Sequence, residues 1–390
     1  MTPAGAFTKK STENRRANKK PEEIALSQPE KRLEIPFKIT VTRAWSVYLG
    51  RGLAGRIGDF VDLKAYSSLV LVTDETTDRL YGEPVAAILA QSGKKVLRFS
   101  LPVGEIAKSP ESLAEGYTFL MENGVDRSAL LVILGGGVPG DAGGYLAASY
   151  LRGIDYIQVP TTLLAQVDSA IGGKVGVNFG GKKNMVGSFY QPKTIIADVD
   201  FLKSLPPQEM RNGLAEILKY GLAMDKDLFE RLEHKKDADF KAAELIPIIE
   251  RCAALKAKVV MADETERTGA RAILNFGHTI GHALEAASNL EGQHGAAVSF
   301  GMVVASRISA RLGMLSASAT PRIEAVLKKF GLPVHAPQVT PGELLANLKF
   351  DKKTSGGEPR WVLLAEIGRG VVNCKVPQAL VSQVLAEVCR

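Results

Sequence analysis

The apolar positions of this chain follow one pattern before about residue 206 and another after it. In the first part, short apolar runs alternate with stretches of helical periodicity. This alternation is typical of βαβ units and predicts an α/β fold, a parallel sheet with helices on both faces. After an opening strand pair within residues 38–51, the predicted strands are 69–73, 95–100, 130–134, 156–159 and 194–197. Helices are predicted between strand 69–73 and about residue 92, over about residues 110–123, and after Gly140.

The second part loses the strand signal almost entirely. From about Pro206 to about Phe330, helical periodicity is broken only by Pro and Gly, which predicts successive helices. A hairpin of 350–353 with 361–366 and a last helix complete the chain. We therefore predict three segments: a tail over 1–34, an α/β domain over 35–203 and a mainly helical domain over 204–390.

Composition and charge exclude several classes of protein. Apolar residues make up 45% and charged residues 23% of the 390 positions, which is ordinary for a globular protein with a large core. There is no apolar run long enough to span a membrane, and no apolar segment follows the first charges, so neither a span nor a secretory signal is predicted. The three cysteines have no paired spacing and indicate reduced thiols in a cytoplasmic protein.

The first 34 residues carry eight Lys/Arg, five Asp/Glu and one aromatic residue, and so contribute +3 of the net +7. Such a segment cannot bury enough apolar surface to order itself, which predicts a disordered basic tail. The remaining +4 is too small to indicate nucleic acid and fits a small anionic substrate.

A polar stripe within 271–294 holds three of the five histidines. If the segment is helical from Arg271 onward, the spacing of four and three places Arg271, Asn275, His278, His282 and Glu285 on one face. Buried polar groups need partners, so this face predicts contact with a metal ion, a phosphate or a carboxylate.

A second polar pair, Glu216 and Lys219, lies three residues apart in GLAEILKYG. Alone, it is typical of a surface ion pair. Together with two histidines of the stripe, Glu216 would complete a His₂Glu site of the catalytic zinc type. The spacing does not decide which two histidines bind, although His278 and His282, four apart, are the simplest choice.

Two glycine-rich segments suggest anion binding. Gly135, Gly137 and Gly140 match G-x-G-x-x-G between a predicted strand and a predicted helix, where backbone N–H groups can approach a pyrophosphate and Asp141 can accept from a hydroxyl. A tight packing turn is the alternative interpretation. Residues 160–192 form a long predicted loop in which Lys174, Lys183 and Asn184 suit phosphate groups.

Taken together, GGGVPGDAGG, SYLRG, VPTTLLAQVDSAIGGKVGVN, KKNMVGSFYQP, GLAEILKYG and LNFGHTIGHALE with HGAAV resemble the 3-dehydroquinate synthases, a family of sugar-phosphate cyclases, over about 70–368. The resemblance implies an NAD-binding α/β domain, a helical metal domain, one divalent metal (Zn or Co) and a homodimer. It also implies a small phosphorylated sugar acid as substrate. In this family, bound NAD transiently oxidises a ring hydroxyl, phosphate leaves by β-elimination, and reduction, ring opening and an intramolecular aldol follow.

The resemblance also implies residue roles. The metal ligands would be Glu216, His278 and His294, and His282 would lie near the phosphate. The NAD contacts would be Asp74, Glu105, Lys108, Gly137, Val138, Pro139, Gly140, Asp141, Thr161, Thr162, Asp168, Lys174, Lys183, Phe201, Leu202, Lys203 and Ser204. The substrate contacts would be Lys174, Asn184, Lys219, Lys256, Arg271, Asn275, His282 and Lys352 or Lys353, with Arg152 reaching the site of the partner subunit.

The chain departs from the family pattern at three places. Ala296 stands where the family usually has Glu, which predicts the loss of a partner of the metal site. Pro139 replaces an aliphatic residue, and 263–271 is one residue longer than usual, which affects whether Glu266 takes the family's acidic substrate-binding position. The other hypotheses are a cyclase for a different phosphorylated sugar, a polyol dehydrogenase and a non-catalytic NAD-binding regulator.

Overall fold

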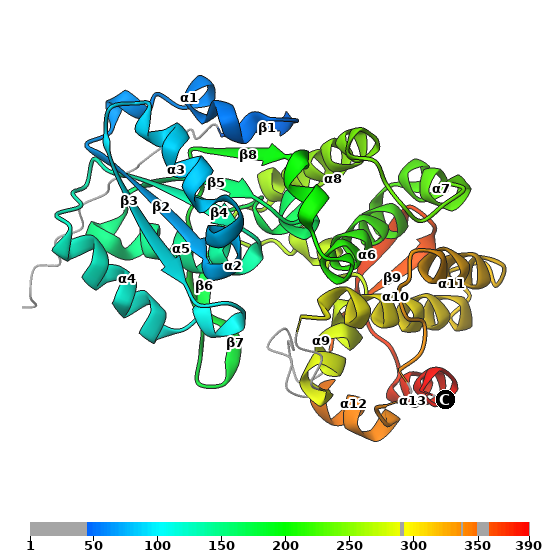
Figure 1. Ribbon diagram of the computed structural model, residues 1–390. Helices are drawn as coiled ribbons and strands as arrows, with labels where there is room; N and C mark the ends of the chain where they lie inside the picture. Colours follow the sequence, from blue (N-terminus) through cyan, green and yellow to red (C-terminus); the bar gives the residue numbers. More distant parts are fainter. Residues whose placement is uncertain (1–44, 289–291, 337, 349–358, 390) are drawn as a thin grey trace, which may run out of the picture. The chain divides into compact units, whose positions relative to one another are not determined.

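A computed structural model describes residues 45–288, 292–336, 338–348 and 359–389 (Figure 1). The predicted tail over 1–34 lies outside these residues, and the predicted division near residue 204 stays a prediction. No helix in the described ranges is both long and apolar enough to cross a membrane.

A six-stranded parallel sheet forms the first part, as the alternating pattern predicts. Its strand order is β1-β8-β5-β4-β2-β3, and every neighbouring pair is parallel. The strands are β1 (Ser46–Gly50), β2 (Ser68–Asp74), β3 (Lys95–Leu101), β4 (Leu130–Gly135), β5 (Asp155–Pro160) and β8 (Thr194–Asp198).

Helices cover both faces of this sheet (Figure 1). Successive side chains of a strand point to opposite faces, so Val70 and Leu131 pack with α4 and α5, whereas Leu69 and Leu130 pack with α1 and α3. Burial on both faces explains the continuous apolar runs of β2 and β4. The helices are α1 (Ile57–Phe60), α2 (Glu75–Thr77), α3 (Glu83–Ala90), α4 (Pro110–Glu122) and α5 (Gly137–Ser149).

The segment predicted as a long loop instead contains a β-hairpin of β6 (Lys174–Phe179) and β7 (Lys182–Phe189). Its sequence shows no alternation because β7 is exposed along its whole length. Gly176 and Gly187 face each other across the pair, and a Cβ at Gly176 would come within 2.6 Å of the carbonyl oxygen of Val186. The glycines that suggested a loop therefore allow two backbones to approach closely.

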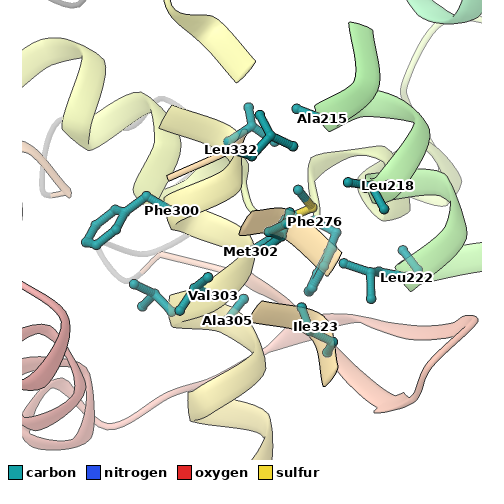
Figure 2. Close-up of a cluster of buried hydrophobic side chains, with 14 of the residues drawn as sticks. Ala215, Leu218, Leu222, Phe276, Phe300, Met302, Val303, Ala305, Ile323 and Leu332 are labelled. Carbon is teal, nitrogen blue, oxygen red and sulfur yellow. The ribbon is translucent and has the colours of Figure 1, made fainter. Parts of the chain in front are cut away.

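The second part is mainly helical, as predicted, and contains the largest core cluster. Figure 2 shows Phe276, Met302 and Val303 of this core, with Leu218 from the neighbouring helix. Its helices are α6 (Pro207–Met224), α7 (Lys226–His234), α8 (Ala242–Ala262), α9 (His278–Ala287), α10 (His294–Arg311), α11 (Ala319–Lys329), α12 (Pro341–Leu348) and α13 (Gln378–Val388). The helix α12 was not predicted.

A hairpin does occur near the end of the chain: β9 (Trp361–Glu366) pairs antiparallel with β10 (Arg369–Cys374). The expected partner of 361–366, residues 350–353, lies outside the described residues. Gly368, with φ of 89°, makes the tight turn between the two strands. The prediction missed β10 because its sequence, RGVVNC, has no alternation of apolar and polar residues, and none of its six residues is fully buried.

Candidate active site

The polar segment beginning at Arg271 is not one helix. A 3₁₀ helix covers Ala270–Asn275, the chain turns at Gly277 with φ of 80°, and α9 then begins at His278. A Cβ at Gly277 would come within 2.6 Å of Met302 and 2.8 Å of the Val298 carbonyl oxygen. Glycine thus permits both the left-handed turn and the close packing of α9 on α10. The expectation of one continuous helical stripe is wrong for this reason.

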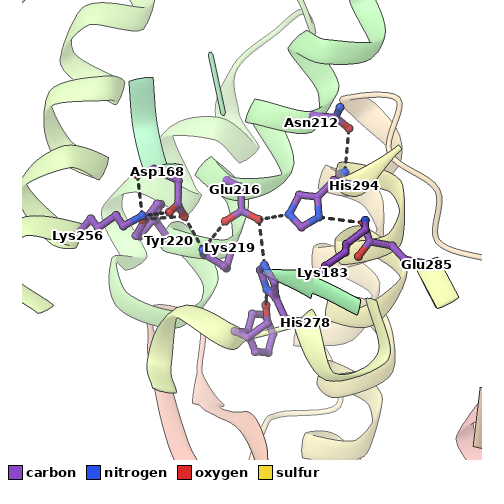
Figure 3. Close-up of polar contacts among 12 residues, drawn as sticks. Asp168, Lys183, Asn212, Glu216, Lys219, Tyr220, Lys256, His278, Glu285 and His294 are labelled. Carbon is purple, nitrogen blue, oxygen red and sulfur yellow. Dashed lines mark hydrogen bonds and ion pairs between the residues drawn. The ribbon is translucent and has the colours of Figure 1, made fainter. Parts of the chain in front are cut away.

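Three ligand-type side chains nevertheless converge. Glu216 lies in the middle of α6, and His278 and His294 are the first residues of α9 and α10. One possible ligand atom of each lies within 4.8 Å of the others (Figure 3). The Nε2 atoms of His278 and His294 are 3.5 and 3.3 Å from the same Glu216 oxygen. Two imidazoles and a carboxylate are the donor set of catalytic zinc sites with an open position, so these residues fit a divalent ion.

The outer nitrogen of each histidine also has a partner. His278 Nδ1 is 3.2 Å from the Phe276 carbonyl oxygen, and His294 Nδ1 is 3.3 Å from a Glu285 oxygen. Ala296 therefore does not leave His294 without an acceptor, because Glu285 of α9 supplies one. Glu285 belonged to the polar stripe, but the sequence gave no reason to pair it with His294.

The pKa values of the two histidines are shifted in opposite directions. Burial, together with nearby Lys219, holds the pKa of His278 well below its usual value. Burial opposes charge on His294 as well, but its hydrogen bonds to Glu216 and Glu285 outweigh burial and raise its pKa to about 9. The two imidazoles that face the same Glu216 oxygen thus differ in how strongly their surroundings favour a proton.

His282, the simplest choice for a second histidine ligand, lies outside this cluster. Its ring is as far from that of His278 as the ring of His294 is, but among the described residues only Glu216, His278 and His294 bring ligand atoms within 4.8 Å of one another. The first turn of α9 points His278 at Glu216, and the start of α10 places His294 there instead. The geometry thus favours the ligand set implied by the resemblance over the i,i+4 pair.

Beside the metal cluster, a buried carboxylate holds two lysines. Asp168 forms ion pairs with Lys219, at 2.8 Å, and with Lys256, and it accepts from the hydroxyl of Tyr220 at 3.1 Å. Although burial opposes its charge, Lys219 and Lys256 hold the pKa of Asp168 well below its usual value. Lys219 also pairs with Glu216, so the predicted surface pair is in fact buried. Asp168 thus connects the lysines to the metal cluster.

These groups line a cavity of about 230 Å³. Arg271 also lines it, is only 2% exposed, and donates to the carbonyl oxygens of Glu264 and Gly172. Its Nε is buried and has no hydrogen-bond partner among the residues that the structure describes. The residues of this cavity are Leu164, Asp168, Ser169, Lys174, Glu216, Lys219, Lys256, Arg271, Leu274, Asn275, His278 and His294.

A second cavity of about 730 Å³ shares Asn275 and His278 with the first. Its lining includes His282 and Glu266 as well as Arg360, which the sequence analysis did not single out. Glu266 is 2.5 Å from Lys174 of β6, so it lies beside a predicted substrate contact. Lys352 and Lys353 lie outside the described residues.

Most of the predicted NAD contacts follow the carboxyl ends of the parallel strands. They come after β2 (Asp74), β3 (Glu105, Lys108), β4 (137–141), β5 (Thr161, Thr162) and β8 (201–204). In an open parallel sheet, ligands bind at this edge where the strand order reverses. Here the reversal lies between the adjacent strands β2 and β4, because the chain continues from β2 to β3 on one side and from β4 to β5 on the other side.

The glycine turn after β4 fits a nucleotide. Helix α5 begins at Gly137, and a Cβ there would lie 3.2 Å from the Ser169 hydroxyl. Buried Lys108 pairs with Asp141 at 2.8 Å, which fixes the first turn of the helix. Pro139 is accommodated within this turn and is buried. The first backbone N–H groups of a helix have no partner within the helix, so the start of α5 is the kind of position at which a phosphate can bind.

Other predicted contacts lie elsewhere. Asp168 belongs to the first cavity, and Lys183 extends from β7 to Glu285 at 3.7 Å. Asn184, with φ of 54°, donates its backbone N–H to Asn178 at 2.9 Å. Arg152 is exposed, has φ of 67°, and lines neither cavity. Asn184 and Arg152 are thus not brought to the metal cluster within one subunit.

Comparison with known proteins places this architecture in a class. Glycerol dehydrogenase from Schizosaccharomyces pombe has a similar fold, at 16% identity and a TM-score of 0.60 over 91% of this chain and 92% of that one. Two protein-family models match the chain: 3-dehydroquinate synthase N-terminal over residues 98–212, and 3-dehydroquinate synthase C-terminal over residues 213–354. The chain belongs to the 3-dehydroquinate synthase family of sugar-phosphate cyclases.

Two solved structures of cyclases are similar over nearly the whole chain. The 2-epi-5-epi-valiolone synthase of Streptomyces hygroscopicus subsp. jinggangensis, with NAD⁺ and Zn²⁺ bound, is 30% identical, with a TM-score of 0.82 over 91% of this chain and 99% of that one. A 2-deoxy-scyllo-inosose synthase complexed with carbaglucose-6-phosphate, NAD⁺ and Co²⁺ is 25% identical, with a TM-score of 0.81 over 88% and 96%.

Proposed function

We propose that this protein is a 3-dehydroquinate synthase, which converts 3-deoxy-D-arabino-heptulosonate 7-phosphate to 3-dehydroquinate and phosphate. The observation that carries the proposal is the first cavity, where a His₂Glu cluster lies beside buried Lys256 and Arg271. This substrate has a carboxylate, a ring with several hydroxyls and a phosphate. Cations for the acid group and a metal site for the hydroxyls are therefore required close together.

Arg271 supports a substrate with a carboxylate. Its guanidinium is 2% exposed, and burial lowers its pKa, so an anion in the cavity would relieve a desolvated charge. An unpaired buried donor costs on the order of 1–3 kcal/mol, and Arg271 Nε has no partner within the described part of the chain. A bound carboxylate would supply the missing acceptor.

NAD and one divalent metal, Zn or Co, are the proposed cofactors. The edge of the sheet around α5 would hold NAD, and Glu216, His278 and His294 would hold the metal. When bound, NAD takes up and returns a hydride, and the metal polarises substrate oxygens. The similar cyclases with NAD⁺ and with Zn²⁺ or Co²⁺ bound support this assignment.

The side chains of the chain itself would position the substrate. Lys174 and Lys256 would hold anionic groups, and Asp168 keeps Lys219 next to Glu216. His282 and Asn275, on the wall of the second cavity, would hold the phosphate. Fixed positive charge placed where negative charge develops is the largest contribution such a site can make to rate. In a homodimer, Arg152 would reach the partner's phosphate site.

The second candidate is a cyclase for another phosphorylated sugar, because the similar cyclases named above act in other reactions. A sugar phosphate such as glucose 6-phosphate has no carboxylate to pair with Arg271. A simple polyol dehydrogenase would not need the anion-binding set of the first cavity. A non-catalytic regulator would tolerate loss of a ligand-type residue, but Glu216, His278 and His294 are all present.

The deciding assay is phosphate release, with NAD present, from 3-deoxy-D-arabino-heptulosonate 7-phosphate and, separately, from glucose 6-phosphate. We expect release from the first only, abolished by a chelator and restored by Zn²⁺ or Co²⁺. Release from glucose 6-phosphate alone would replace the proposal with the second candidate. Phosphate release that continues unchanged in the presence of the chelator would reject the metal-dependent mechanism.

A further inference from the structure

The two histidines of the metal cluster are held in different ways at their outer nitrogen. Both direct Nε2 at the same oxygen of Glu216. His278 Nδ1 faces a neutral carbonyl at 3.2 Å, whereas His294 Nδ1 faces the carboxylate of Glu285 at 3.3 Å. Only His294, among the described residues of the cluster, has a second carboxylate behind its ring (Figure 3).

We propose that Glu285 is the positioning residue of the metal centre, which fixes His294 as the Nδ1–H tautomer with Nε2 directed at the ion. This inference rests on the metal site of the proposed function. A carboxylate behind a ligating imidazole fixes the ring orientation and makes the ligating nitrogen more basic. Glu285 would hold the ring of His294 and would not itself be a ligand, because it faces Nδ1 while Nε2 faces Glu216.

The surroundings of Glu285 fit this role. Its side chain is 13% exposed, and Lys183 Nζ of the β6–β7 hairpin is 3.7 Å from the same carboxylate oxygen that faces His294 Nδ1. The lysine favours the charged form of the carboxylate, and it connects a strand of the α/β part to the metal centre.

Two hydrogen bonds from another side chain hold the backbone around His294. The side chain of Asn212, one turn before Glu216 on α6, accepts from the N–H of Gly295 at 2.8 Å and donates to the carbonyl of Gly292 at 2.9 Å. Asn212 thus fixes where His294 begins α10, and the orientation of the ring is left to Glu285. Loss of Glu285 should therefore change the metal site without moving the helix.

The test compares Glu285→Gln and Glu285→Ala with a matched control, Glu324→Gln. Glu324 is also mostly buried, at 15% side-chain exposure, and paired with a cation, Arg307, but lies outside both cavities. The measurements are the Kd of Co²⁺ by competition with a chelator and the visible absorption of bound Co²⁺, which reports its coordination geometry. Circular dichroism of each metal-free variant checks the fold.

We expect the Kd to rise about 10-fold in Glu285→Gln and up to about 100-fold in Glu285→Ala. The cobalt spectrum should shift in both, with partial recovery in Glu285→Asp and no change in Glu324→Gln. A folded Glu285→Gln with wild-type Kd and spectrum would overturn the role of Glu285 alone. A wild-type protein that binds no Co²⁺, or a His294→Ala variant that still binds it fully, would overturn the metal centre as well.

Discussion

The two cofactor sites proposed for this protein differ in whether backbone or side chains form them. The nucleotide edge consists largely of backbone: strand ends, the N-terminus of α5 and a turn whose glycines pack closely against neighbouring side chains. The metal and anion site consists of side chains that hold one another, in the order Lys256, Asp168, Lys219, Glu216, His294 and Glu285. A backbone site should tolerate side-chain changes but not added volume, and a side-chain network should fail when any member is lost.

The strongest test of this contrast is His294→Ala. Loss of a ligand should remove stoichiometric metal and reduce phosphate release to background, because two remaining ligands bind a divalent ion weakly. The fold should persist, since His294 is the first residue of α10 and contributes little to the core. Metal content by mass spectrometry of the native protein and circular dichroism measure the two effects. Full metal content in this variant would contradict the ligand assignment.

Arg271→Gln should have the next largest effect. The buried guanidinium would no longer pair with a substrate carboxylate, at about 3 kcal/mol, or roughly 200-fold in kcat/KM. Metal content should stay at the wild-type level, and this separates anion binding from metal binding. Steady-state kinetics with 3-deoxy-D-arabino-heptulosonate 7-phosphate measures the loss. An equal loss of metal would show that the anion and metal parts of the network are not separable.

His282→Ala should be milder than His278→Ala, although the two residues are one turn apart on α9. His282 lies in the second cavity. The His282→Ala variant should therefore retain metal while losing about 10- to 200-fold in rate, as expected for one charge-assisted hydrogen bond of about 1.5–3 kcal/mol. His278→Ala should lose both metal and activity. The comparison is metal content and turnover of the two variants side by side, and equal metal loss in both would restore the i,i+4 ligand pair.

Gly137→Val should have the smallest effect and should concern NAD only. The added side chain would point at the Ser169 hydroxyl, 3.2 Å from the position of the Cβ, and would occupy space next to the predicted pyrophosphate. We expect the Kd for NAD, measured by fluorescence titration, to rise about 10-fold, which is about 1.4 kcal/mol. Metal content should not change. Asp74→Ala at the same edge serves as the side-chain control and should weaken NAD binding less.

Much of the fold followed from the sequence because buried strands leave a strong signal. The apolar runs of β2 and β4 are buried on both faces and were predicted directly. The exposed strand β7 has no such signal, and its glycine is equally consistent with a loop and with two strands whose backbones approach closely. The turn at Gly277 was also unpredictable, because it depends on the approach of α10.

The site was predictable only in part. Periodicity placed polar residues near one another, but it could not choose His294, since that choice depends on how α9 and α10 pack on α6. The ligand set came from the resemblance and not from spacing. Asn212 and Glu285 were missed as partners of His294 because each contact joins segments far apart in the chain or across a turn. Family membership is shown by the comparisons, whereas the individual residue roles stay predictions.

The position of β1 at the edge of the sheet has a consequence for how the chain folds as it is synthesised. Ser46 of β1, the first strand in the described part of the chain, pairs with Thr194, so 148 more residues must be synthesised before the partner of this strand exists. The strands β2, β3, β4 and β5 can pair in the meantime, but contacts between residues so distant in sequence form slowly. Closure of β1 against β8 therefore completes the sheet, and the nascent chain carries an unpaired strand until residue 198 has left the ribosome.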